Sequence, residues 1–127
     1  METLMEKKYS LGLYEKAMPT ELSWEEKLLA AKEAGYDFVE ISIDETAEKL
    51  SRLDMSGQER RQLILTMHQT GIPIRTMCLS GHRKYPLGSL DPAIRSKGME
   101  IMNKAVRLAD DMCIRVIQLA WYDVYYE

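Results

Sequence analysis

The chain has 127 residues, of which 46% are hydrophobic and 29% charged, with a formal net charge of −3 and a pI near 5.5. This length predicts one domain over residues 1–127 with a real core. The acidic balance argues against a nucleic-acid partner, and no apolar run approaches the ~18 residues of a membrane span, so no membrane contact and a cytoplasmic location are expected.

The first predicted elements are a strand and a helix. Residues 9–14 are β-prone and lead into a loop. Ser23 and Glu26 stand at capping-box spacing, which predicts a helix over 24–34, and Gly35 follows where a left-handed helix stop is needed.

The next segment predicts a buried strand and a second helical unit. Residues 38–43 are apolar almost throughout, the pattern of a strand covered on both faces. Residues 46–53 are polar and helical in pattern. A further helix is expected to start at the capping box of Ser56 and Glu59 and to end at Gly71.

The last segment predicts a strand, a helix and a strand. Residues 74–79 form the third strand, and 80–90 form a long loop rich in Gly, Pro and basic residues. Asp91 and Pro92 predict a helix start, and 114–120 form the fourth strand.

The element order is therefore βαβαβαβ. Short strands that alternate with amphipathic helices predict an α/β fold with four parallel strands and right-handed crossovers, which is the N-terminal half of a (β/α)8 TIM barrel. Cys78 and Cys113 both lie in apolar segments, which favours two buried free thiols over a disulfide.

Several segments resemble the L-ribulose-5-phosphate (L-xylulose-5-phosphate) 3-epimerases of bacterial pentose and ascorbate catabolism, within the xylose isomerase-like barrels. The segments are Leu11–Ala17, Asp37–Glu40, Asp44–Thr46, Arg52–Asp54, Met77–Ser80, His82–Arg83, Ile117–Ala120 and Tyr122–Glu127. The resemblance implies a full barrel of roughly twice this length that acts on a ketopentose 5-phosphate with a bound divalent metal. It also implies that the metal ligands come from the second four strands.

The chemistry explains what a half-barrel would lack. Inverting carbon 3 beside a carbonyl requires proton removal from one face, an enediolate stabilised by a Lewis acid, and proton return on the other face. The only histidines are His68 and His82, without a supporting ligand motif. No catalytic residue, metal ligand or cofactor is therefore expected in this chain, and alone it should not turn over.

Substrate-binding candidates follow from the rule that barrel sites lie at the carboxyl ends of the strands. Tyr14 is interpreted as a wall of the sugar pocket or as core packing with its hydroxyl at the rim. Glu40 should point into the barrel, and it either faces the ligand or, as we favour, forms an ion pair with Arg75 or Arg115.

The basic loop after residues 74–79 offers a phosphate site. His82, Arg83 and Lys84 supply donors and positive charge, Arg83 as a bidentate fork and Lys84 as a point charge, and the alternative is a solvated basic loop. The same rule also nominates Glu15 and Asp44 by position.

Two residues depart from the family pattern. Cys113 stands where the family has a turn glycine, and holding a side chain at positive φ costs on the order of 1 kcal/mol. Trp121 replaces a glycine at the end of the fourth strand, where its side chain would project at the barrel mouth.

A rival hypothesis is a truncated or engineered half-barrel that acts as a self-associating structural module. The first and fourth strands would be open edges, and we expect the inward face to be apolar, which predicts a homodimer or larger assembly. The residues assigned to that inward face are Val39, Ile41, Met77, Ile117 and Leu119.

Overall fold

The computed structural model describes residues 8–119, so the interpretation of Trp121 and of residues 120–127 lies outside the described residues. The elements in chain order are β1 (Gly12–Tyr14), η1 (Glu15–Ala17), α1 (Trp24–Glu33), β2 (Phe38–Ile43), α2 (Ala47–Ser51), η2 (Arg52–Asp54), α3 (Gly57–Thr70), β3 (Ile74–Leu79), η3 (Gly81–Arg83), α4 (Pro92–Met112) and β4 (Val116–Leu119).

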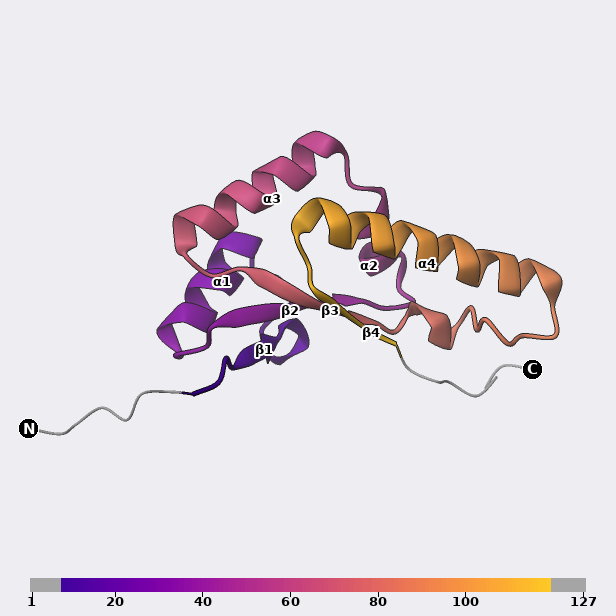
Figure 1. Cartoon of the computed structure of the whole chain (residues 1–127), viewed down its shortest axis with the longest axis horizontal. Coiled ribbons are helices and arrows are strands. Elements are labelled where there is room, and N and C mark those ends of the chain that lie inside the picture. The colour runs from indigo at the N-terminus through magenta and orange to yellow at the C-terminus, as the bar shows by residue number, and fades with distance from the viewer. Residues whose placement is uncertain (1–7, 120–127) are drawn as a thin grey trace, which may run out of the picture.

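The strands form one parallel sheet in the order β1-β2-β3-β4, with α3 and α4 over the same side of it (Figure 1). This is the arrangement of half of a (β/α)8 barrel, as the sequence predicted.

Local signals predicted the helix ends well. Ser23 caps α1 in a complete capping box with Glu26, and the side chain of Ser56 caps α3. Gly71 ends α3 in the left-handed conformation at φ 78°, and Asp91 caps α4 directly before Pro92. These signals are reliable because a cap satisfies orphan backbone groups within one turn of the chain.

The helix-covered face of the sheet holds the core. Val39, Ile41 and Met77 are at most 1% exposed and belong to one cluster with side chains of α1, α3 and α4. Ile117 lies on the same face by its register with Met77, and Leu119 by its register with Leu79. The prediction that these five residues face the barrel interior is therefore wrong.

The other face, called the open face below, is largely polar. It carries Glu40 and Ser42 of β2, and hydrogen bonds link Tyr14 to Ser42 and Glu40 to Thr76 across the strands. An apolar strand sequence does not indicate which of its two alternating sets of side chains the helices cover. In β2 the polar residues Glu40 and Ser42 indicate the face that the helices leave open.

Cys113 shows that the predicted turn strain is present. It is the residue after α4, at φ 57° and ψ 33°, and it is the one non-glycine residue with positive φ between residues 8 and 119. Both cysteines are free, as expected. The prediction that both are buried is wrong, since Cys113 is exposed and Cys78 is half-buried.

Candidate functional site

A polar wall runs across the open face near the carboxyl ends of three strands. The Tyr14 hydroxyl of β1 donates to Oγ of Ser42 at 3.2 Å, and Oγ1 of Thr76 on β3 donates to Glu40 at 2.7 Å. Cys78 follows Thr76 two residues later on β3, so it shares this face. Hydroxyl, carboxylate and thiol groups therefore stand together where a barrel binds its ligand.

The Tyr14 hydroxyl is influenced by its burial and by its hydrogen-bond partner. Burial raises the pKa of Tyr14 above its ordinary value of 10.0, against the opposing effect of the Ser42 hydroxyl. The hydroxyl therefore stays protonated at neutral pH. Ser42 is completely buried, whereas Tyr14, whose hydroxyl it accepts from, is half-buried.

Glu40 does not have the partner that was favoured from the sequence. It bonds to Thr76, whereas the guanidinium of Arg75 lies 5.4 Å from the centre of the Phe38 ring. Among the ion pairs of residues 8–119, none joins Glu40 to Arg75 or Arg115, so that interpretation is wrong. The Glu40 carboxylate remains available as an acceptor on the wall.

A second polar group stands beside the wall, at the ends of β1 and β2. Nζ of Lys16 lies 2.8 Å from one carboxylate oxygen of Asp44, and the other oxygen accepts from the amide and hydroxyl of Thr46. Burial alone raises the pKa of Asp44, but the Lys16 ammonium and the Thr46 donors outweigh it and hold the pKa below its ordinary range. The side chain of Lys16 is 43% exposed.

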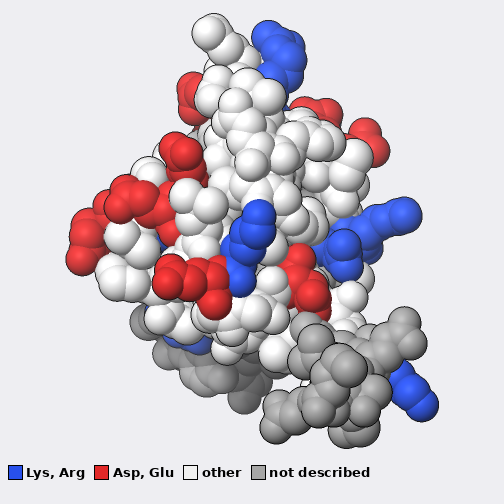
Figure 2. Space-filling view, turned by 90° about the vertical axis from the view of Figure 1, so that its left-hand side faces the viewer, with Lys and Arg blue, Asp and Glu red and all other residues white. Residues whose placement is uncertain are grey.

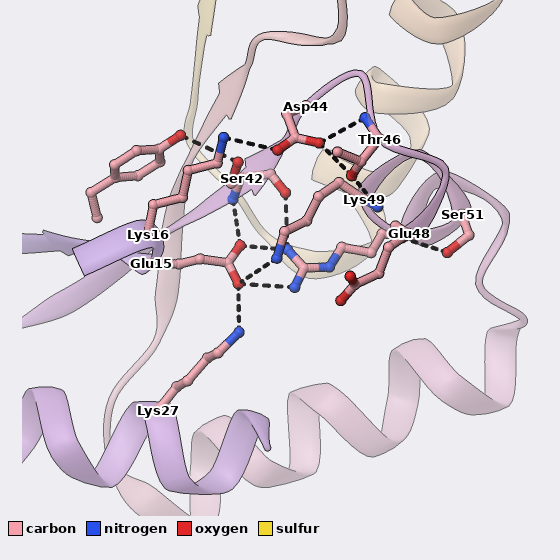
Figure 3. Close-up of polar contacts among 11 residues, drawn as sticks. Glu15, Lys16, Lys27, Ser42, Asp44, Thr46, Glu48, Lys49 and Ser51 are labelled. Carbon is pink, nitrogen blue, oxygen red and sulfur yellow. Dashed lines mark hydrogen bonds and ion pairs between the residues drawn. The ribbon is translucent and has the colours of Figure 1, made fainter. Parts of the chain in front are cut away.

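Behind the strand ends lies a buried ionic cluster centred on Glu15, drawn in Figure 3. One carboxylate oxygen lies 2.8 Å from Nζ of Lys27 and 3.5 Å from Nζ of Lys49, and Arg52 donates to both oxygens. Burial alone raises the pKa of Glu15, but these cations and the Ser42 amide lower it to about 2. Glu15 is therefore ionised at any physiological pH.

The structure separates the two residues of the predicted phosphate loop. His82 of η3 is 4% exposed, and its Nε2 lies 2.9 Å from the carbonyl oxygen of Gly98 on α4. Arg83 is exposed, and Lys84 lies with its ammonium 5.7 Å from the centre of the Tyr85 ring. His82 thus attaches the loop to α4, and Arg83 is the member of the pair that reaches solvent.

The described donors do not fit a divalent metal. Within residues 8–119 no three His, Cys, Asp or Glu side chains come together as a metal-binding group. The acidic groups at the strand ends are instead bonded to lysine, arginine and threonine. No catalytic step is therefore assigned to a metal held by these residues.

The charged side chains of the surface are of mixed sign (Figure 2). On the face that Figure 2 presents, acidic and basic side chains are interspersed, without the continuous basic surface that contact with a nucleic-acid backbone uses. In the part of the chain that the structure describes, no helix is long and apolar enough to cross a membrane.

Comparison with known proteins agrees with the fold. Residues 28–127 match the family model of the xylose isomerase-like TIM barrel. The chain belongs to this family. SgbU of Escherichia coli (strain K12) is 57% identical over 119 residues, and the L-ribulose-5-phosphate 3-epimerase UlaE of Salmonella heidelberg (strain SL476) is 53% identical over 124 residues.

These matches cover 94% and 98% of this chain, which spans only 42% and 44% of the length of the two relatives. That coverage agrees with the N-terminal half of a barrel. Among solved structures, a D-psicose 3-epimerase matches with a TM-score of 0.69 at 16% identity, over 86% of this chain and 36% of the other. YcjR, a 3-keto-D-glucoside 4-epimerase from Escherichia coli, matches with a TM-score of 0.65 at 21% identity, over 87% of this chain and 37% of the other. At these identities the structural matches show the fold alone.

Sequence reasoning missed most of the Glu15 cluster. Glu15 itself was nominated by its place after a strand, but Lys27, Lys49 and Arg52 stand in helices, where lysine and arginine usually face solvent. In the fold the cations of Lys27 and Arg52 lie 4.9 and 5.0 Å from the centre of the Trp24 ring, and neither contact could be predicted from the sequence. Pairing these residues required the fold.

Proposed function

We propose that this chain is the N-terminal half of an epimerase that inverts carbon 3 of a ketopentose 5-phosphate, and that it supplies one wall of the sugar pocket. The observation that carries the proposal is the polar wall of Tyr14, Glu40, Thr76 and Cys78 on the open face. Identity of 53% along 98% of the chain to an L-ribulose-5-phosphate 3-epimerase supports the same substrate class.

The wall is suited to a polyhydroxylated ligand. The Tyr14 hydroxyl donates or accepts, and the Glu40 carboxylate accepts from sugar hydroxyls, as Thr76 already shows by donating to it. The aromatic ring of Tyr14 also presents an apolar surface to the carbon-bound hydrogens of a sugar. These groups bind and orient the ligand.

Phosphate recognition needs exposed cations at the same end of the sheet. Arg83 follows β3 and Lys16 follows β1, and both side chains reach solvent. A guanidinium binds two phosphate oxygens at once, and an ammonium adds a point charge. We assign the phosphate contact to Arg83 and Lys16, with His82 holding the Arg83 turn against α4.

The proton chemistry belongs to the other half of the barrel. Epimerisation requires groups on opposite faces of carbon 3, whereas the wall provides one face only. In the full barrel a divalent metal would polarise the carbonyl and stabilise the enediolate. The chain alone is therefore proposed to be inactive.

The experiment joins this chain to the second half of UlaE and measures epimerisation of L-ribulose 5-phosphate. Arg83→Ala should raise KM more than it lowers kcat, because a contact to a remote phosphate is made equally in the ground state and the transition state. Arg107→Ala, on the exposed surface of α4, is the matched control. If KM were unchanged in Arg83→Ala, Arg83 would not contact the phosphate, and the loop would be a solvated basic loop.

A second candidate function is self-association of a half-barrel module. The observation that favours it is β4, an edge of the described sheet on which Val116 is 54% and Leu119 42% exposed. Two copies would pair β4 of each with β1 of the other and rebuild a ring. Molecular mass in solution, measured over a range of protein concentrations, tests it.

A further inference from the structure

The carboxyl end of β2 extends beyond the strand that should pair with it. β1 has three residues, and its last pair in the parallel register is Tyr14 with Glu40. Ser42 lies two residues further along β2 and is completely buried. A buried backbone amide and carbonyl without partners would each cost a substantial part of a domain's stability, so their bonding needs an explanation.

Two side chains supply those bonds in place of a strand. The Ser42 amide donates to a carboxylate oxygen of Glu15 at 2.7 Å, and the Ser42 carbonyl oxygen accepts from Nη1 of Arg52 at 2.9 Å. Arg52 also binds Glu15 through two nitrogens, so carboxylate, guanidinium and peptide form one closed set of bonds (Figure 3).

The side chain of Ser42 transmits this geometry to the pocket wall. Its Oγ accepts from the Tyr14 hydroxyl at 3.2 Å, and Tyr14 is the half-buried member of that pair. A displacement of the Ser42 backbone therefore moves the partner of the Tyr14 hydroxyl. Glu15 directly follows Tyr14 in the chain, so the same carboxylate also fixes the end of β1.

We propose that Glu15 and Arg52 are positioning residues for the sugar-pocket wall: together they bind both backbone polar groups of Ser42 and thereby set where the Tyr14 hydroxyl stands. This inference rests on the proposed function for its significance to catalysis. Its geometric content, the coupling from Arg52 through Ser42 to Tyr14, does not depend on which ligand the wall binds.

The alternative hypothesis is that the cations of the cluster only neutralise the buried charge of Glu15. Lys27 provides the comparison, because it shares two partners with Arg52 but has no contact with Ser42. Both cations bind Glu15 and both lie over the Trp24 ring, but only Arg52 reaches Ser42. If the cluster only neutralises charge, replacing Lys27 or Arg52 should affect Ser42 equally. If Arg52 positions Ser42, only its replacement should affect Ser42.

The experiment uses this chain with two variants that separate charge from geometry. Arg52→Lys keeps the charge but removes the fork that spans Glu15 and Ser42, whereas Lys27→Met removes a charge and leaves every contact to Ser42 in place. Amide hydrogen exchange is followed by NMR at Ser42, with the Val39 and Ile41 amides of the same strand as internal references.

We expect Arg52→Lys to speed exchange at Ser42 by about tenfold or more relative to the reference amides and to shift the ring signals of Tyr14. The reason is that Glu15, which accepts the Ser42 amide hydrogen bond, loses the two-nitrogen guanidinium contact that fixes its carboxylate. Lys27→Met should leave both readouts at their wild-type values after correction for global stability. Equal effects at Ser42 in the two variants, or a larger effect in Lys27→Met, would overturn the inference.

The same readouts separate this inference from the proposed function. A selective change at Ser42 and Tyr14 supports the positioning role even if the joined barrel does not epimerise a ketopentose phosphate. An active barrel in which Arg52→Lys changes neither Ser42 nor Tyr14 rejects the positioning role and keeps the function.

Discussion

Glu15 should make the stability of this chain sensitive to mild acid. Its pKa is about 2 in the folded chain against an ordinary value of 4.5, so the ionised form stabilises the fold. The stabilisation is fully present above pH 4.5 and is lost as the pH falls toward 2. The difference between the two pKa values corresponds to about 3 kcal/mol of unfolding free energy at neutral pH.

The assay is urea unfolding from pH 7 to pH 3, on the wild type and on Glu15→Gln. At neutral pH the variant should be less stable by about 3–5 kcal/mol, because Lys27, Lys49 and Arg52 remain around a neutral amide. The difference should shrink as the pH falls. Glu100→Gln is the control, since that carboxylate is exposed.

If wild type and Glu15→Gln lost stability in parallel between pH 5 and pH 3, the ionised carboxylate would not be the source of the acid sensitivity. The description of the cluster as a stabilising set of buried ion pairs would then be wrong.

Three further predictions concern the backbone and the sheet edge. Cys113→Gly should stabilise the chain by about 1 kcal/mol in thermal unfolding, because glycine adopts φ 57° without strain, and an unchanged melting temperature would contradict this. Gly98→Ala should destabilise it by about 1–3 kcal/mol, since a Cβ there would stand 2.6 Å from the Tyr85 carbonyl oxygen, and a neutral effect would reject that contact. If the chain self-associates through β4, Val116→Lys should weaken the assembly in light scattering, whereas Val106→Lys on α4 should not.

The sequence predicted the features that depend on neighbouring residues. The helix starts at Ser23, Ser56 and Asp91 were correct because a cap is decided within one turn. The strained turn at Cys113 was predicted from the family resemblance, and the backbone angle confirms it. The strand ends were less accurate, since residues 9–11 were assigned to the first strand and lie outside β1.

Features that depend on tertiary contacts could not be predicted. Val39 and Ile41 were assigned to the barrel interior because an apolar run carries no sign of which face the helices cover. Glu40 was paired with arginine because a carboxylate in a strand needs a partner, and the partner is the neutral hydroxyl of Thr76. In both cases residues distant in sequence decided the outcome.

The decisive experiment measures epimerisation of L-ribulose 5-phosphate with Mn2+, for this chain alone and for the chain joined to the second half of UlaE. We expect no turnover by the chain alone and turnover by the joined barrel, with Tyr14→Phe and Glu40→Gln each raising KM. Turnover by the chain alone would contradict the assignment of the proton chemistry to the other half. If the joined barrel folds but neither substitution changes its KM, the assignment of the wall as the sugar site would be contradicted.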